Sequence, residues 1–199
     1  MQPDQFRQLC KWLAVSKFAG SPKFVMTASA LLPRRRTVSE QQASALASDA
    51  WEGYPFSLHS LLAHICENQI KGVVFLSGDE HVSSVTSARV TALKTGAQCT
   101  LHSIHSSGLF SPYPFGDGSP DEFMTNDSFD FKVGTTRLEY RCDAKTTFFP
   151  GDGFALATAH NNTSPRCSLN NISPSWSLNV KFYNSAGMKP HGEENFDLI

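Results

Sequence analysis

The residues with the clearest capacity for chemistry are a carboxylate and an imidazole two positions apart, Asp79 and His81. They follow the apolar run Val73-Val74-Phe75-Leu76, whose β-branched and aromatic content is typical of a buried strand. Gly78 then allows the backbone to turn sharply. In sheets that alternate strands with helices, ligands bind outside the carboxyl ends of the strands. Because carboxylate oxygen and imidazole nitrogen suit hard or borderline cations, the pattern predicts metal ligands at positions 79 and 81.

The elements that must position this pair alternate between helix and strand. A helix is predicted over residues 4–15, a strand over 23–28, a weaker helix over 39–47, and a stronger helix from Pro55, a residue suited to a first turn. The two stronger helices each place apolar residues on one face: Phe6, Leu9, Cys10 and Leu13 in the first, and Leu58, Leu61, Leu62 and Ile65 in the second.

The second half of the chain changes character and predicts successive strands. These cover residues 82–94, 100–105, 129–136, 137–142, 146–149, 153–160 and 177–184, with a Gly- and Pro-rich loop at 107–120. We therefore expect an α/β fold of the α+β kind in one domain over residues 1–199. Residues 1–81 would form βα units ending at the metal motif, and 82–188 mostly antiparallel sheet. The polar residues 189–199 are expected to form a poorly ordered tail.

Composition excludes several classes of protein. A length of 199 residues with 40% hydrophobic content supports one folded domain. The formal net charge of −1 gives no general attraction to nucleic acid or to an anionic membrane. No apolar run is long enough for a transmembrane helix, and residues 1–10 lack the apolar centre of a signal peptide. The basic run Arg34-Arg35-Arg36 is interpreted as a solvated loop, with attraction of phosphate as the alternative.

Other reactive side chains have simpler interpretations. The five cysteines contain no Cys-x-x-Cys pair, which argues against a zinc knuckle, and a bridge from Cys99 to Cys142 or Cys167 stays open. The remaining histidines are interpreted as structural, with His59 pointing to solvent. Four aspartates could bind calcium or simply belong to a surface loop: Asp117, Asp121, Asp127 and Asp130. The motifs of a serine hydrolase elbow and of a P-loop are absent from the sequence.

Four segments, in this order and spacing, carry a resemblance to a known family. They are Gln8 with Trp12-Leu13 ahead of residues 23–29, Asp49-Ala50-Trp51-Glu52-Gly53-Tyr54-Pro55 followed by Leu61-Leu62, residues 73–81, and Ser106-Ser107-Gly108-Leu109. Together they resemble the C-terminal portion of the alkaline phosphatase D family, which are PhoD-like enzymes of the calcineurin-like metallophosphoesterases. The resemblance covers roughly residues 5–115 and continues more weakly beyond.

The resemblance implies the C-terminal part of an αββα sandwich and the hydrolysis of phosphate mono- or diesters. Asp79 and His81 match the last metal-ligand pair of a two-metal centre of iron, calcium, manganese or zinc. Trp51 and Tyr54 would lie near the substrate, a phosphate ester, although packing of the loop explains them equally well. No catalytic residue is assigned. Relatives can be exported, so the compartment stays open.

Two departures from the family qualify this expectation. Leu58, followed by His59, stands where the family usually carries an arginine. The family's earlier aspartates and its acidic-histidine motif have no counterpart before Asp79. Two ligands do not hold two metal ions, because each ion takes four to six. The chain therefore looks like a C-terminal portion of such a phosphatase. The alternative is a non-catalytic fragment or β-rich interaction module, and either is expected to self-associate through exposed strand surface.

Overall fold

The computed structural model describes residues 3–36, 50–78, 80–109, 119–135, 138–163, 175–184, 187 and 189–199. Helix α1 (Pro3–Ser16) continues into the short η1 (Lys17–Ala19) and leads to strand β1 (Lys23–Met26). After η2 (Trp51–Gly53) come helix α3 (Pro55–Glu67) and strand β2 (Val73–Ser77). None of the described helices combines the length and apolarity that a membrane crossing requires.

Both predicted amphipathic helices are present, and each buries its apolar face. In α1, Leu13 is fully buried while Phe6 and Leu9 pack partly against the core. In α3, Pro55 occupies the first turn, where its missing N–H costs nothing, and the predicted apolar positions are buried: Leu58, Leu61, Leu62 and Ile65. The weaker helix predicted over residues 39–47 lies outside the described residues.

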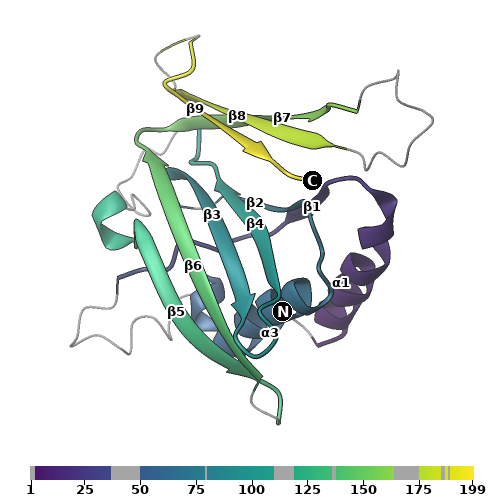
Figure 1. Cartoon of the computed structure of the whole chain (residues 1–199). Helices are drawn as coiled ribbons and strands as arrows, with labels where there is room; N and C mark the ends of the chain where they lie inside the picture. Colours follow the sequence, from purple (N-terminus) through teal and green to yellow (C-terminus); the bar gives the residue numbers. More distant parts are fainter. Residues whose placement is uncertain are drawn as a thin grey trace.

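A mixed six-stranded sheet, in the order β1-β2-β4-β3-β6-β5, forms the centre of the fold (Figure 1). Strands β1, β2 and β4 (Gln98–His105) are parallel, whereas β3 (Ser83–Ala92), β6 (Leu138–Phe149) and β5 (Asn126–Val133) pair antiparallel. The short η3 (Pro120–Glu122) precedes β5. The parallel strands of this sheet therefore all carry their carboxyl ends to one edge, where the predicted ligand pair follows β2.

A second, three-stranded antiparallel sheet lies across one end of the large sheet (Figure 1). It consists of β7 (Gly153–Asn161), β8 (Trp176–Asn184) and β9 (Gly192–Asp197). One core joins the helices to one face of the large sheet, with Val73 and Phe75 contributing from β2. A second core joins Val74 and the opposite face to the small sheet. The expected α+β class, rich in strands after residue 82, is confirmed.

Two expectations about the second half were wrong. Two strands were predicted, over 137–142 and 146–149, but residues 138–149 form the single strand β6, whose alternation of buried and exposed residues runs through Asp143 and Lys145 without a break. The last residues are no loose tail, because β9 pairs with β8 along its length. Leu198 is buried against the second core, with Phe196 beside it, so a short apolar repeat within a polar segment is enough to fix the strand.

Candidate active site

The carboxyl ends of β1, β2 and β4 meet at one edge of the large sheet, and the candidate site is built there. The ladder continues past the strand ends, since the Thr27 N–H donates to Leu76 O at 2.9 Å and the Ser106 N–H to Ser77 O at 3.0 Å. The loop after β2 carries the sequence motif. Glu80 and His81 of this loop are described, whereas Asp79 lies outside the described residues.

The His81 side chain lies between two later segments of the chain, one at Gly108 and one at Asp152. Its side chain is 16% exposed, and its Nδ1 lies 3.6 Å from Asp152 Oδ1 in the turn between β6 and β7. On another side the backbone of Gly108 approaches so closely that an added Cβ would lie 3.4 Å from His81 Nε2. At 3.6 Å the contact is longer than a hydrogen bond, whereas a carboxylate that accepts a hydrogen bond from one ring nitrogen is what typically supports a metal-bound histidine. Asp152 was missed in the sequence, because no local motif links it to position 81.

Two hydrogen bonds hold the turn before β7 against the segment after β4. The Ser107 hydroxyl donates to Gly151 O at 3.1 Å, and the Gly153 N–H donates to Gly108 O at 2.9 Å. The segment 106–108, one of the four stretches behind the family resemblance, therefore fixes the position of Asp152 relative to His81.

Glu80, the residue between the two predicted ligands, is bound at both its backbone and its side chain. His105 Nε2 lies 3.1 Å from the carbonyl oxygen of Glu80, and His105 Nδ1 lies 2.9 Å from the hydroxyl of Ser77. The carboxylate of Glu80 accepts a hydrogen bond from the guanidinium of Arg35. Neither partner was anticipated from sequence, since both contacts join residues distant in the chain.

Arg35 is the centre of a charge cluster and does not lie on the solvated loop that we expected. Its Nη1 donates to Glu122 at 2.6 Å, and its backbone N–H donates to Glu52 Oε2 at 2.6 Å. The guanidinium also lies over the ring of Phe123, 4.8 Å from its centroid. The solvated interpretation fails because residues 34–36 run beside residues 122–124 and exchange backbone hydrogen bonds with them.

The neighbouring Arg34 is also structural. It binds Asp127 through two parallel hydrogen bonds of 2.7 and 2.8 Å, and the Asp127 side chain is 2% exposed. Its guanidinium stacks over Phe129 at 3.7 Å from the ring centroid. These contacts occupy Asp127 with an ion pair, which argues against the calcium interpretation at this position, and Asp130 is likewise paired with Arg141.

The cluster holds three carboxylates and one guanidinium, Arg35. Burial shifts the pKa of a carboxyl group and that of a guanidinium in opposite directions. Burial by itself lowers the pKa of Arg35, but its hydrogen bonds and charge contacts with Glu80 and Glu122 outweigh that effect, so its pKa is raised. Burial raises the pKa of Glu52, opposed by the Arg35 N–H and by the two arginine charges. Three carboxylates therefore surround one guanidinium that stays positively charged.

Trp51 and Tyr54 line a hollow of about 570 Å³ beside the end of β1. Trp51 is 7% exposed and Tyr54 is 52% exposed, so the indole is packed while the phenol is accessible. The hollow also contacts the α1 residue Leu9 and the segment 26–29. Glu52 lies between these aromatic residues and is joined to Arg35, which connects the hollow to the loop after β2.

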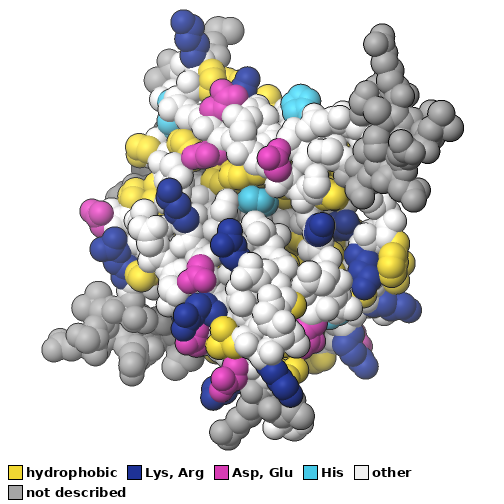
Figure 2. All heavy atoms as spheres, in the orientation of Figure 1, with side chains coloured by type: hydrophobic (Ala, Val, Ile, Leu, Met, Phe, Trp, Pro, Cys, Tyr) yellow, Lys and Arg dark blue, Asp and Glu magenta, His cyan; other side chains and the backbone are white. Residues whose placement is uncertain are grey.

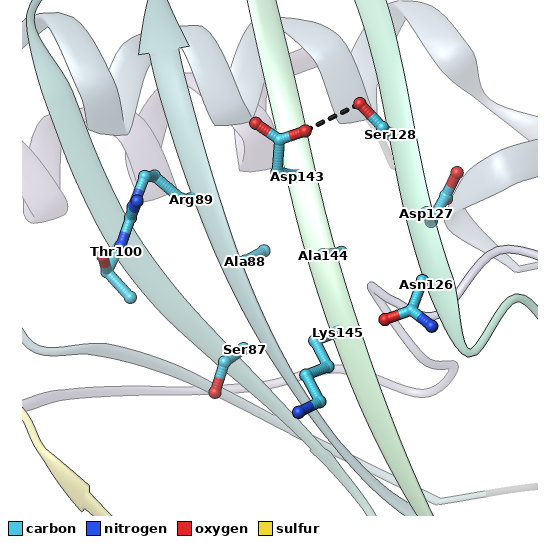
Figure 3. Close-up of a pocket in the computed structure, with 10 residues that line it drawn as sticks. All are labelled: Ser87, Ala88, Arg89, Thr100, Asn126, Asp127, Ser128, Asp143, Ala144 and Lys145. Atoms are coloured by element: carbon cyan, nitrogen blue, oxygen red, sulfur yellow. Dashed lines mark hydrogen bonds between the residues drawn. The ribbon is translucent and has the colours of Figure 1, made fainter.

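A second hollow, of about 420 Å³, lies on the open face of the large sheet away from the helices (Figure 3). Its polar lining includes Arg89, Lys145 and Asp143, which accepts a hydrogen bond from Ser128 at 2.7 Å. Figure 2 shows acidic and basic side chains interspersed over this face. The lining comes from the middle of β3 and β6, the start of β5 and Thr100 near the start of β4, so this hollow is separate from the carboxyl edge of the parallel strands.

The sequence matches the PhoD-like phosphatase family over residues 3–147. The chain belongs to this family. The matched residues include α1, the parallel strands and the whole loop after β2, and they end within β6. The expectation drawn from the four sequence segments is therefore confirmed at the level of the family.

A solved structure of PhoD is similar over 96% of this chain, with 15% sequence identity and a TM-score of 0.41. The chain spans 31% of the length of that structure. None of the curated proteins compared with the sequence matches it.

A PhoD-like phosphatase implies metal ions, and the donors at the carboxyl edge fit such ions in kind. His81 with Asp152 beside it, next to the Asp79 of the motif, provides imidazole and carboxylate groups. They do not fit in number. Among the described residues, no three His, Cys, Asp or Glu side chains lie close enough to hold one ion. The described residues therefore do not by themselves form a site for a metal ion.

Two histidines away from this edge of the sheet, His102 and His59, pack against aromatic rings. His102 contacts Ser87 Oγ at 3.0 Å and stacks on Phe196, and burial lowers its pKa to about 4. His59 does not point to solvent as expected, because it stacks on Phe131 with 4.7 Å between ring centroids. The four cysteines among the described residues are all free thiols: Cys10, Cys66, Cys99 and Cys142.

Proposed function

We propose that this chain takes part in the metal-dependent hydrolysis of phosphate mono- or diesters, as the C-terminal portion of a PhoD-like phosphatase. The observation that carries the proposal is the position of the Gly-Asp-Glu-His loop at the carboxyl edge of β1, β2 and β4 in a member of this family. That edge is where sheets of this kind bind their ligands.

In this proposal Asp79 and His81 are metal ligands, and Asp152 orients the imidazole of His81 through its Nδ1. A bound cation would neutralise charge on the phosphate and lower the pKa of a coordinated water. The chain's own residues shape the site: the Gly108 backbone limits the movement of the His81 ring, and Tyr54 offers an accessible aromatic surface to a substrate group.

The test is metal binding by the purified chain and by variants of its motif. Asp79→Ala and His81→Ala are each expected to abolish stoichiometric binding of Mn²⁺ or Zn²⁺ measured by equilibrium dialysis. Glu193→Ala, an exposed carboxylate on β9, is the matched control and is expected to bind as the parent chain does. Equal metal content in the parent and both motif variants would refute the assignment of ligands.

A second candidate function is that of a non-catalytic β-rich interaction module. The shortage of metal donors among the described residues favours it. Hydrolysis of p-nitrophenyl phosphate by the purified chain separates the two proposals. Metal-dependent turnover that disappears in His81→Ala supports the enzyme, whereas turnover indistinguishable from a no-protein blank at every metal tested supports the module.

A further inference from the structure

Glu80 is held from two sides by residues that the proposed metal chemistry does not use. We propose that His105 and Arg35 are positioning residues, which fix Glu80 and thereby the loop that presents Asp79 and His81. This inference rests on the proposed function for what the loop presents, but the fixing of the loop is a property of the chain without metal. We call the contacts of His105 and Arg35 with Glu80 the Glu80 clamp.

The first arm of the Glu80 clamp acts on the backbone. His105 is 2% exposed, so its ring nitrogens are expected to form hydrogen bonds within the protein. The carbonyl oxygen of Glu80 can only accept, which requires a hydrogen on His105 Nε2. In the neutral imidazole Nδ1 then accepts from the Ser77 hydroxyl, at 2.9 Å. The Glu80 carbonyl thus sets the tautomer of His105, and Ser77 at the end of β2 holds the other side of the ring.

The second arm acts on the side chain. The planar guanidinium of Arg35 binds Glu80 with one nitrogen and Glu122 with another, while its own backbone N–H is bound to Glu52. Contact with the ring of Phe123 further restricts the guanidinium plane. A lysine has a single ammonium on a flexible stem and cannot reproduce this fork. Arg35 therefore joins the loop after β2 to the segment around Trp51 and to η3.

A residue held at both its carbonyl oxygen and its carboxylate has little freedom of rotation. His81 follows Glu80 directly and shares a planar peptide bond with it, so holding Glu80 also limits the movement of the His81 backbone. Ligands held in place before a metal arrives avoid the cost of ordering them on binding. The Glu80 clamp therefore supplies preorganisation, and it uses no residue that itself donates to the metal.

The direct test is amide hydrogen exchange on the full chain without metal, read by mass spectrometry on peptides covering residues 77–83. His105→Phe keeps the ring volume but removes both hydrogen bonds, and Arg35→Met keeps the stem but removes the fork. Each is expected to accelerate exchange in this peptide about tenfold, as expected when a buried hydrogen bond is lost. The matched control is His102→Phe, another buried histidine of β4 that contacts Ser87 and not the loop. It should leave the peptide unchanged.

Two further variants keep the test valid if a ring substitution unfolds the protein. Ser77→Ala removes only the hydroxyl that orients His105 and should produce a smaller acceleration. His105→Gln places an amide N–H near the position of Nε2 and should restore most of the protection. Unchanged exchange in His105→Phe, Arg35→Met and Ser77→Ala would overturn the proposal.

Cobalt titration then separates failure of this inference from failure of the proposed function. With Co²⁺ as the probe, the visible absorption band of the bound ion reports coordination geometry. A shifted band and about tenfold weaker binding in His105→Phe, reversed in His105→Gln, support positioning. If the parent chain binds no Co²⁺ but the variants still loosen the loop, the clamp stands and the metal assignment fails. If Co²⁺ binds equally to all variants and exchange is unchanged, the clamp is refuted and the metal assignment stands.

Discussion

The burial of His102 makes a quantitative prediction about stability and pH. An ordinary histidine has a pKa of 6.5, whereas burial lowers that of His102 to about 4 in the folded chain. Between these values the unfolded chain binds a proton that the folded chain does not. The stability contributed by neutral His102 is thus fully present above about pH 6.5 and is lost as the pH falls towards about 4.

The size of the effect follows from the same two values. At about 1.4 kcal/mol for each tenfold change in proton affinity, the complete loss is about 3 kcal/mol, and about 2.5 kcal/mol of it should be reached by about pH 4.5. The side chain is 6% exposed, so solvent screens this contribution little. That is a large fraction of the stability of a typical domain.

The measurement is urea unfolding followed by far-UV circular dichroism, from about pH 7 to about pH 4.5, on the parent chain and on His102→Phe. The variant keeps an aromatic ring against Phe196 but has no group that titrates in this range. Carboxylates titrate equally in both proteins, so only the difference between the two free energies is used. That difference should shift by about 2.5 kcal/mol in favour of the variant at the acid end. Parallel curves would refute the assigned burial of His102.

Three other perturbations have clear expected outcomes. Arg34→Met leaves the buried carboxylate of Asp127 without its partner and should lower the free energy of unfolding by about 3–5 kcal/mol in urea, most of it recovered by adding Asp127→Asn; a loss below about 1 kcal/mol would contradict the buried ion pair. The purified chain should self-associate through β1, at the edge of the described sheet, where Met26 is 86% exposed; Met26→Lys should shift its sedimentation towards monomer, and a monomeric parent chain would remove the basis of this expectation. Gly153→Ala should lower the melting temperature sharply, because the new Cβ would lie 1.8 Å from Tyr183 O, and an unchanged value would show that β7 and β8 are spaced differently.

Local patterns predicted the elements that bury one face. The spacing of apolar residues predicted α1 and α3, because one buried face of a helix repeats every three to four residues. The continuous apolar run before Gly78 predicted β2. Local patterns failed where the bounds of a strand depend on its pairing with a neighbouring strand. The break expected within β6 fell at residues 143–145, but a strand with one exposed face accepts Asp143 and Lys145 on that face. The strand β9 forms because β8 offers it an edge, and the apolar positions Phe196 and Leu198 are too few in residues 189–199 to indicate a strand from sequence.

The candidate site divides in the same way. The motif alone predicted the position of His81 after β2. Asp152, the neighbour of His81, and Arg35 and His105, the partners of Glu80, were not predicted, because they lie 25 to 71 positions away in the sequence from the residues that they contact. The arginine run was misread for the same reason. Three consecutive arginines normally indicate a solvated segment, and only the fold brings Glu52, Glu80 and Glu122 to Arg35.

The charge cluster around Arg35 also bears on the choice between an enzyme and an interaction module. Glu52 Oε1 is buried, and no described residue donates a hydrogen bond to it, although Arg35 Nε lies 3.9 Å away. Three carboxylates face one guanidinium here, and burial opposes the charge of Glu52 in particular, whereas Glu122 is 49% exposed. Features that oppose stability tend to lie at functional sites. Here the costly cluster borders the loop that carries Asp79 and His81, which favours a chain built to present those residues over one built only to pack.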